Sequence, residues 1–185
     1  VKSFFTERGF QLASDALQVF GGYGYVHEYR IEQILRDSRI AMIYEGTNQI
    51  QALDLLQRKV LSGPDGLAPL LEVFAAEAAL PSAHAASLQS WCDTLAQATH
   101  ALAQDAAQDA ELPARAAEDY LRLVGTVALA YTWCRAARVA QALDPAHPAH
   151  TQKREGARYF FDYVLPGAAH WLRLVQAARH PVAPV

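Results

Sequence analysis

The amino-acid sequence predicts an all-α protein built from two helical parts, and three observations support this. Apolar residues recur at spacings of three and four along nearly the whole chain, and the alternation typical of strands is almost absent. One dense cluster of turn-forming residues, "SGPDG" from Ser62 to Gly66, interrupts the pattern, and alanine is much commoner after it than before. We therefore expect one part over residues 1–62 and a second over residues 66–185.

Three helices are expected in the first part. The first should run from about Ser3 to Phe20, where the glycines of "GGYG" end it because adjacent glycines make a poor helix and a permissive turn. A short second helix should cover residues 28–38, and a third should begin near Gly46 or Thr47, with Thr47 as a plausible N-cap, and reach about residue 61. The first helix should carry Phe5, Leu12, Ala16 and Val19 near one face, and the second should carry Ile31, Ile34 and Leu35 inward. The third should run through Ile50, Leu53 and Leu56.

Long amphipathic helices with short connections predict that the second part is an antiparallel bundle. Pro113 is a good first helical residue, "DPAHPAH" should form a loop, and Pro166 should kink the last helix. The expected helices cover residues 67–80, 82–108, 113–143 and 151–178. The second of them should carry one stripe at spacings of three and four, made of Leu88, Trp91, Leu95, Ala98 and Leu102. In the last of them Phe160, Val164, Trp171, Leu174 and Val175 are expected to face the core.

Composition narrows the class of protein. The chain has 185 residues, enough for one domain with a sizeable core or for two small ones. Hydrophobic residues make up 52% of it and charged residues 19%, which is typical of a globular chain and not of a disordered one. The net charge of −3, without any block of basic residues, argues against nucleic acid or an anionic membrane as a partner.

The first residues and the cysteines bear on where the protein works. Charges at Lys2, Glu7 and Arg8 argue against a signal peptide, and the longest apolar stretches are too short for a membrane span. Cys92 and Cys134 are too few for a disulfide scaffold and lack zinc-ligand spacing, so we expect buried thiols in a reducing compartment, the cytoplasm. Because the chain begins inside a helical pattern without an initiator methionine, we expect a piece of something longer.

Two patterns could carry chemistry but have ordinary explanations. His147 and His150 flank Pro148 in a predicted loop, so solvated histidines are favoured over a metal site, and no metal is expected. "QVFGGYGY" places a glycine pair directly after a helix, where exposed amides could hold a pyrophosphate. It neither follows a strand nor opens a helix as a dinucleotide fingerprint does, so taken alone it favours a plain turn.

A carboxylate, Glu45, stands at an unusual place in "IAMIYEGTNQIQ". It lies between an apolar run ending in Tyr44 and a glycine, Gly46, where a loop is expected to meet a helix. An acid there can project into a cleft, where it could act as a general base. The alternative, an acid that interacts with the first turn of its own helix, is somewhat favoured on these residues alone.

Taken together, "QVFGGYGYVHEYRIEQILRDSRIAMIYEGTNQIQ" resembles the C-terminal helical domain of the FAD-dependent acyl-CoA dehydrogenases. The resemblance is continuous over residues 18–51 and looser from about residue 4 to residue 61. It implies that residues 1–62 form the C-terminal part of a four-helix-bundle domain. In the family that domain follows an N-terminal helical domain and a middle β-domain, which this sequence does not include. The resemblance also overturns the ordinary explanations of the glycine turn and of Glu45.

The resemblance implies the oxidation of an acyl-CoA thioester to a trans-2-enoyl-CoA. Glu45 would remove the pro-R α-proton while a hydride leaves the β-carbon for N5 of FAD, and the backbone N–H of Glu45 would help to polarise the thioester oxygen. Tyr44 would line the acyl pocket, and Gly46 would leave room for the thioester. Electrons would pass on to an electron-transfer flavoprotein. The isolated chain is expected to be inactive without the missing domains.

The resemblance also implies how the cofactor is held. Thr47 and Gln49 match positions that contact FAD. Gln18, Gly21 and Gly22 match a segment that reaches the adenosine and pyrophosphate of the FAD bound to the neighbouring subunit. This implies a homodimer or a homotetramer.

From about Gly66 onward the chain departs from the shorter family members. It looks like the extra C-terminal helical domain of the longer acyl-CoA dehydrogenases, a branch that includes the methylmercaptopropionyl-CoA dehydrogenases, and "YFFDYVLPGA" supports this. Two alternatives stay open: a helical oligomerisation or interaction module without turnover, and an acyl-CoA oxidase on the same fold. Nitroalkane chemistry uses an aspartate base, so Glu45 argues against it. Arg36 and Asp37 are expected to form a structural ion pair at a helix end.

Overall fold

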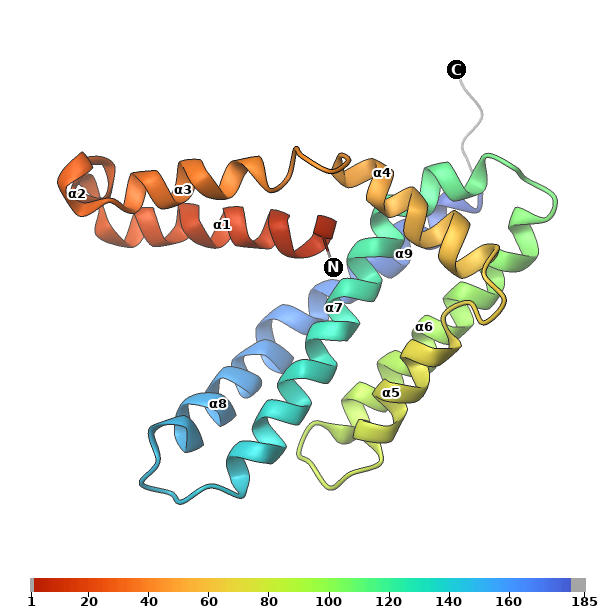
Figure 1. Cartoon of the computed structure of the whole chain (residues 1–185). Helices are drawn as coiled ribbons and strands as arrows, with labels where there is room; N and C mark the ends of the chain where they lie inside the picture. The colour runs from red at the N-terminus through yellow and green to blue at the C-terminus, as the bar shows by residue number, and fades with distance from the viewer. Residues whose placement is uncertain (1, 181–185) are drawn as a thin grey trace. The chain divides into compact units, whose positions relative to one another are not determined.

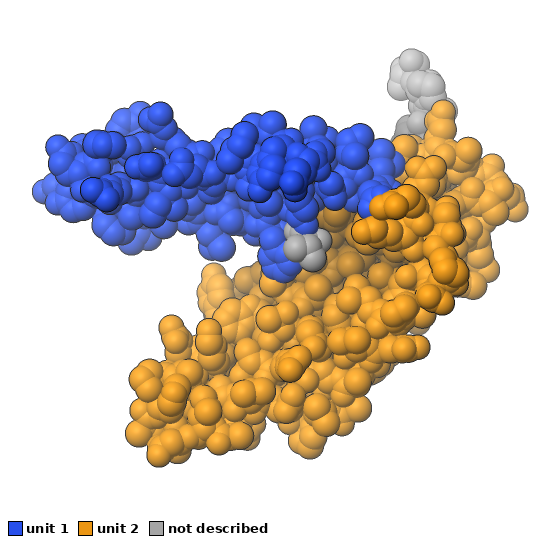
Figure 2. Space-filling model, viewed as in Figure 1, with its two compact units in different colours: residues 1–54 blue, residues 55–185 orange. Residues whose placement is uncertain are grey.

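The computed structural model describes residues 2–180, and within that range the chain is helical without any β-strand. This confirms the all-α prediction. The chain divides into two compact units, residues 1–54 and residues 55–185 (Figure 2), and each is described by itself. None of the described helices is both long enough and apolar enough to cross a membrane.

The first unit is a helical hairpin (Figure 1). The helices α1 (Lys2–Phe20) and α3 (Ile31–Ile40) pack side by side and run in opposite directions, and α4 (Asn48–Leu53) contacts α1. One turn of α-helix, α2 (Gly22–Tyr25), and one 3-10 turn, η1 (His27–Tyr29), make the bend of the hairpin. The hairpin therefore brings the start of α1 close to the end of α3 and the start of α4.

Glycine is required at two positions of the bend. Gly21 has a φ of 58°, in the left-handed region that glycine adopts at little cost. A Cβ at Gly24 would come within 2.6 Å of the carbonyl oxygen of Leu17, so no side chain fits there. The prediction that glycines end the first helix is confirmed, because α1 stops at Phe20.

The apolar residues predicted to lie near one face of the first helix are exposed in α1. Phe5, Leu12 and Val19 have exposed fractions of 49%, 67% and 85%, and Ala16 is also exposed. The buried residues of α1 are Ser3, Phe4 and Ala13. Among the described helices, α3 makes the most extensive contact with α1. A second apolar stripe on the same helix therefore has nothing within the unit to cover it.

The second helix begins later than predicted. Residues 27–29 form a separate 3-10 turn, and Arg30 has a φ of 58°, so the α-helix starts at Ile31. Ile34, which was expected to be inward, is 57% exposed, and Ile50 on α4 is 58% exposed. The hairpin is thus a thin assembly whose outer faces keep a high apolar content.

The second unit is an antiparallel bundle, as predicted (Figure 1). Its longest helix, α7, packs against α5, α6, α8 and α9. The helix α4 continues directly as a π-helix, η2 (Asp54–Leu61), which ends before the loop that leads into the bundle. The other elements are α5 (Ala68–Ala78), α6 (Ala85–Ala106), α7 (Leu112–Gln141), α8 (Pro148–Tyr159), the π-helical η3 (Phe160–Val164), the 3-10 turn η4 (Leu165–Gly167) and α9 (Ala168–Ala178).

The core of the second unit combines a predicted apolar stripe with two polar anchors. Leu88, Leu95 and Leu102 of α6 are fully buried, and Cys92 and Cys134 are buried free thiols, as expected. The buried hydroxyl of Tyr120 shares a hydrogen bond of 2.7 Å with the hydroxyl of Thr99. Glu77, 6% exposed, accepts two hydrogen bonds from Arg138, at 2.6 and 2.9 Å.

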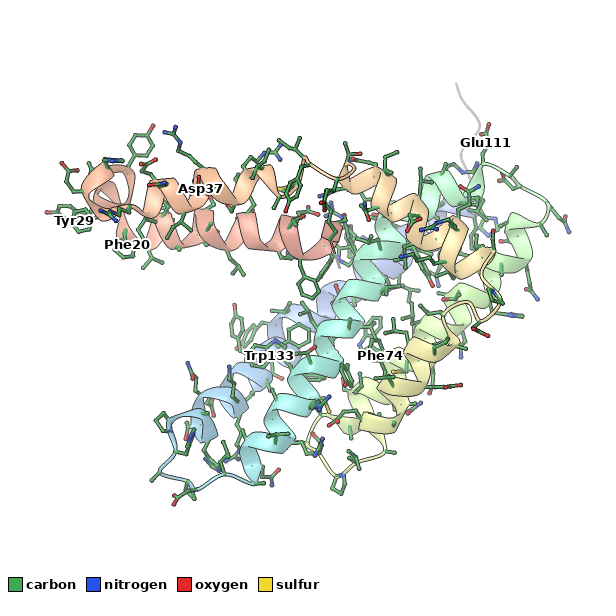
Figure 3. All side chains as sticks on the ribbon, viewed as in Figure 1. Phe20, Tyr29, Asp37, Phe74, Glu111 and Trp133 are labelled. Atoms are coloured by element: carbon green, nitrogen blue, oxygen red, sulfur yellow. The ribbon has the colours of Figure 1, made fainter. Side chains whose placement is uncertain are left out.

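Aromatic side chains join the helices of the second unit (Figure 3). Phe74 of α5 stacks on Tyr131 of α7 with ring centroids 5.0 Å apart, and Trp133 of α7 stacks on Phe160 at 6.4 Å. Gly156 of α8 lies directly beside Trp133, since a Cβ there would come within 2.8 Å of the indole ring. The absence of a side chain at Gly156 therefore sets how closely α8 approaches α7.

The last helix is interrupted where Pro166 was expected to kink it. The α-helix stops at Tyr159, passes through the π-helical η3 and the 3-10 turn η4, and resumes at Ala168. The wider turn of η3 shifts the phase of the pattern, and Val164 is 40% exposed, contrary to expectation. His150 lies on α8 and not in a loop, because this helix already begins at Pro148.

Candidate active site

The loop between α3 and α4 holds Glu45 in a left-handed backbone conformation. The φ of Glu45 is 58°, and Gly46 follows with a φ of 93°. For a residue with a side chain this region costs roughly 1–2 kcal/mol, so surrounding contacts must hold it. The amides of Ile43 and Tyr44 both donate to the carbonyl of Ile40, at 2.9 and 3.2 Å, and tighten the end of α3 immediately before Glu45.

Two side chains from outside this loop hold its backbone. Gln51 Nε2, on α4, donates to the carbonyl oxygen of Glu45 at 3.0 Å. Lys2 Nζ, on the first turn of α1, donates to the carbonyl oxygen of Gly46. The same ammonium lies 5.9 Å from the centroid of the Tyr44 ring, within the range of a cation–π contact. Donors from two different helices therefore fix two consecutive carbonyls.

The carboxylate of Glu45 is exposed and makes no hydrogen bond or ion pair with the described residues. Tyr44, 51% exposed, precedes it, and Gly46 adds no side chain beside it. A carboxylate without a partner, next to an aromatic ring, can accept a proton from a ligand bound at this place. The substrate-binding role of these three residues stays a prediction with which this geometry is compatible.

Polar groups at the start of α4 have unused hydrogen-bonding capacity. Thr47 occupies the N-cap position, as predicted, but its side chain makes no capping hydrogen bond. Thr47 and Gln49 are exposed, and no described residue is bonded to their side chains. The buried Oδ1 of Asn48 also lacks a partner among the described residues. Because buried polar atoms are normally hydrogen-bonded, the Asn48 oxygen is compatible with a donor from a ligand, whereas the exposed side chains of Thr47 and Gln49 can bond to water.

The glycine turn forms the opposite end of the hairpin (Figure 1). Gln18, Gly21 and Gly22 are all exposed, and a Cβ at either glycine would meet nothing within 4 Å, so the backbone is open to a ligand. Phe20 and Tyr29 pack edge to face behind it, with ring centroids 6.4 Å apart (Figure 3). The amide of Gly21 already donates to the carbonyl of Gln18 at 3.0 Å, so the turn offers a ligand open space and not a free Gly21 amide.

A groove of about 450 Å³ adjoins the glycine turn. Within it, Glu32 lies between two basic groups, with His27 Nδ1 at 3.0 Å and Arg36 Nη1 at 3.6 Å from its carboxylate oxygens. Arg36 thus pairs with Glu32 one turn earlier and not with Asp37, because adjacent residues on a helix point in different directions. The residues that line the groove are Leu17, Tyr25, His27, Glu32, Leu35 and Arg36.

The structure separates the predicted site residues into two groups. Tyr44 to Gln49 lie where α3 and α4 meet the start of α1, whereas Gln18 to Gly22 lie at the end of α1 (Figure 1). The 19 residues of α1 make a helix about 27 Å long. The two groups of one chain therefore lie too far apart to contact the same part of a bound molecule.

The second unit offers less chemistry. The ring of His147 caps α8 by accepting a hydrogen bond of 3.1 Å from the amide of Ala149, and His150 is half-buried on the same helix. Among residues 2–180, no group of three or more His, Cys, Asp or Glu side chains could hold a metal ion. All the site residues predicted from the sequence, numbered 18 to 49, belong to the first unit.

Lys2 and Gln51 were not among the residues predicted from the sequence. Gln51 lies at the end of the quoted motif, six residues after Glu45, and a hydrogen bond across the start of a short helix could have been considered. The contact between Lys2 and Gly46 spans 44 residues and depends on how α1 and α3 pack. No local pattern could have indicated it.

Comparisons with known proteins cover both parts of the chain. Residues 67–184 match the family described as "Acetyl-CoA dehydrogenase C-terminal like", and residues 1–60 match "Acyl-CoA dehydrogenase, C-terminal domain". The 3-methylmercaptopropionyl-CoA dehydrogenase of Ruegeria pomeroyi is 37% identical over 150 residues, which cover 77% of this chain and 26% of that protein.

Other relatives match the first part only. An acyl-CoA dehydrogenase of Bacillus subtilis is 44% identical over 62 residues, covering 34% of this chain and 16% of its own length. The cyclohexane-1-carbonyl-CoA dehydrogenase of Geobacter metallireducens is 45% identical over 60 residues, covering 32% of this chain and 16% of its own length. The chain thus spans about a quarter or less of these curated relatives.

Proposed function

Because the chain belongs to the acyl-CoA dehydrogenase family and matches its C-terminal region, we propose that it is the C-terminal part of an FAD-dependent enzyme that oxidises an acyl-CoA to a trans-2-enoyl-CoA. The observation that carries the proposal is Glu45. It is an exposed carboxylate without a partner among the described residues, fixed in a left-handed loop at the junction of α3, α4 and the start of α1.

In the proposed reaction Glu45 is the general base. Its carboxylate accepts the α-proton of the thioester, and the electron pair of that C–H bond forms the new double bond as a hydride leaves the β-carbon. The α-proton is only weakly acidic, so the thioester oxygen must be stabilised as negative charge develops on it. The backbone N–H of Glu45 is assigned to that task, and Gly46 leaves space for the thioester.

Two groups of residues are assigned to the cofactor. Thr47 and Gln49, whose polar side chains have no partner among the described residues, would hold FAD beside Glu45. FAD supplies the acceptor for the hydride. Gln18, Gly21 and Gly22, with their open backbone, would hold the adenosine and pyrophosphate end of a second FAD molecule, bound mainly by a neighbouring subunit.

The partners follow from this assignment. The length of α1 separates the two cofactor-binding groups of one chain, which favours an oligomer in which each FAD contacts two subunits. An electron-transfer flavoprotein is the proposed electron acceptor, and the cytoplasm is the proposed compartment. The proposed substrate is an acyl-CoA thioester. No acyl chain is proposed, because the names of the relatives refer to different acyl groups.

The test uses the longer enzyme to which we propose this chain belongs. Flavin absorbance is followed during anaerobic titration with a panel of acyl-CoAs, for the unaltered enzyme, for Glu45→Gln, and for Glu28→Gln, an exposed glutamate at the hairpin bend, as a matched control. We expect bleaching in the unaltered enzyme and the control. Glu45→Gln should keep its FAD and bind acyl-CoA but fail to bleach.

Bleaching by Glu45→Gln at the normal rate would show that the base lies elsewhere. Reoxidation of the reduced flavin distinguishes the remaining possibilities. Rapid reoxidation by O2 would support the oxidase, and reoxidation by electron-transfer flavoprotein would support the dehydrogenase. A chain that keeps the fold but shows no bleaching in any context would support the non-catalytic module.

A further inference from the structure

Side chains from outside the loop contact three groups in it: the ring of Tyr44, the carbonyl of Glu45 and the carbonyl of Gly46. None of these contacts involves the carboxylate of Glu45. Gln51 Nε2 donates to the carbonyl of Glu45 at 3.0 Å, and Lys2 Nζ donates to the carbonyl of Gly46. The Lys2 ammonium also lies over the ring of Tyr44, 5.9 Å from its centroid. Contacts therefore act on the residue before Glu45, on Glu45 itself and on the residue after it.

These contacts match what a left-handed glutamate requires. A residue with a side chain at φ 58° carries a free-energy cost, so it keeps that conformation only where contacts of the surrounding structure hold it. Gln51 fixes the peptide group that follows Glu45, and Lys2 fixes the next one. The fit is close, because a Cβ at Gly46 would come within 3.2 Å of Gln51 Nε2. The amide of Gln51 therefore occupies the space that a side chain at Gly46 would need.

The two donors also differ in origin. Gln51 belongs to α4, which follows the loop directly, whereas Lys2 belongs to α1, 44 residues earlier in the chain. Lys2 thus ties the loop to the body of the hairpin and sets its position as well as its conformation. A charged donor makes a stronger hydrogen bond to a carbonyl than a neutral one does, so Lys2 is the stronger of the two restraints.

From these contacts we infer that Lys2 and Gln51 are positioning residues, which hold the backbone of Glu45 and Gly46 so that the carboxylate keeps its place against the substrate. This inference rests on the proposed function only in the last step, the effect on catalysis. The effect on the loop itself is a property of the chain and can be measured without any substrate.

The first experiment measures amide hydrogen exchange of Ile43 and Tyr44 in the chain, whose amides donate to the carbonyl of Ile40 immediately before the loop. Lys2→Met and Gln51→Glu remove the donors with little change in size, and Lys2→Arg keeps a charged donor. Arg8→Met is the matched control, because Arg8 lies on the same helix with its guanidinium 5.5 Å from the Phe4 ring and not beside the loop. We expect exchange roughly ten-fold faster in Lys2→Met and Gln51→Glu, and close to normal in Lys2→Arg and Arg8→Met. Unchanged exchange in the first two variants, or equal acceleration in Arg8→Met, would overturn the inference.

The second experiment measures single-turnover flavin reduction by an acyl-CoA in the longer enzyme. Lys2→Met is expected to slow reduction about ten- to a hundred-fold, the scale of a displaced catalytic group, while FAD content and the acyl-CoA dissociation constant stay within about two-fold of normal. Lys2→Arg should restore most of the rate. Loss of FAD or of acyl-CoA binding in Lys2→Met would contradict a positioning role. If Glu45→Gln reduces flavin normally, the proposed function fails, and the hydrogen exchange result still decides whether Lys2 and Gln51 hold the loop.

Discussion

Gly46 combines two restraints at one residue. Its φ of 93° lies in a region that residues with a side chain rarely adopt, and a Cβ would approach Gln51 Nε2 to 3.2 Å. Replacement by alanine therefore strains the backbone and presses on the hydrogen bond between Gln51 and Glu45. Gly46→Ala should lower the free energy of unfolding by about 1–2 kcal/mol.

The matched control for Gly46→Ala is Gly9→Ala. Gly9 lies within α1, where a Cβ would meet nothing within 4 Å, so the substitution should stabilise the chain by about 0.5–1 kcal/mol. Both changes in the free energy of unfolding are to be measured by urea denaturation of the chain. Equal effects of the same sign at the two glycines would contradict the assignment of Gly46 as a conformationally required residue.

Two buried groups, the Cys92 thiol and the Tyr120 hydroxyl, make the free energy of unfolding depend on pH in the alkaline range. Burial raises the pKa of the Cys92 thiol from 9.0 to about 11 and that of the Tyr120 hydroxyl from 10.0 to about 12, although the hydrogen bond with Thr99 opposes the second shift. Because the folded state holds these protons more tightly, their contribution is fully present below about pH 9. It is lost as pH rises through about 11 for Cys92 and about 12 for Tyr120.

The free energy of unfolding should therefore fall between about pH 9 and pH 12, by about 2–3 kcal/mol for the tyrosine alone. Tyr120→Phe should cost about 1 kcal/mol at neutral pH, because it leaves the Thr99 hydroxyl without this partner, and should flatten the curve above about pH 10. Tyr163→Phe, an exposed tyrosine, serves as control. A curve of unchanged slope in Tyr120→Phe would count against burial as the cause.

At the scale of elements, Gly156 sets the distance between α7 and α8. A Cβ there would come within 2.8 Å of the Trp133 ring, so Gly156→Ala must push the two helices apart or move the indole. We expect a loss of about 1–3 kcal/mol in thermal unfolding. Adding Trp133→Phe should recover part of that loss by making room.

Gly167→Ala is the control for Gly156→Ala, because a Cβ at Gly167 would meet nothing within 4 Å. It should change stability by only a few tenths of a kcal/mol. If Gly156→Ala changes the free energy of unfolding as little as this control does, α8 does not pack against Trp133 as closely as these contacts indicate.

Some elements could be predicted from the sequence because they keep one period throughout. The stripe of Leu88, Leu95 and Leu102 on α6 is fully buried, as expected from spacings of three and four. Val164 could not be placed in the same way, because the π-helical η3 changes the number of residues per turn just before it. The exposure of the apolar stripe on α1 could not be predicted either, since an amphipathic pattern indicates which faces are apolar and not which neighbour covers them.

The candidate site could be predicted only in part. The sequence motif predicted Glu45 and its neighbours at the junction of loop and helix, and they lie there. The left-handed conformation of Glu45 could not be predicted. In "YEGT" the glycine is the residue expected to adopt that conformation, and nothing indicates that the glutamate adopts it too. The contact with Lys2 arises only when α1 and α3 pack, so it belongs to the tertiary structure alone.

At the scale of the whole molecule, the exposed apolar face of the hairpin should make the isolated chain self-associate. Leu12 and Val19 are 67% and 85% exposed on one helix. Sedimentation velocity over a wide concentration range should show association that weakens in the double variant Leu12→Glu and Val19→Glu. Gln11→Glu, on a polar face of the same helix, should leave it unchanged, and a monodisperse monomer at all concentrations would contradict this expectation.

The length of α1 has a consequence for mixtures of defective subunits. If each active centre takes Glu45 from one subunit and Gly22 from its neighbour, chains with Glu45→Gln and chains with Gly22→Val are each inactive as pure oligomers. A mixed dimer then has one centre that collects both defects and one centre that collects neither. Co-expression of the two variants should therefore restore measurable dehydrogenation by complementation, whereas mixing either variant with itself cannot. If both variants are inactive and co-expression gives no gain, the two groups of residues do not meet in a centre shared between subunits.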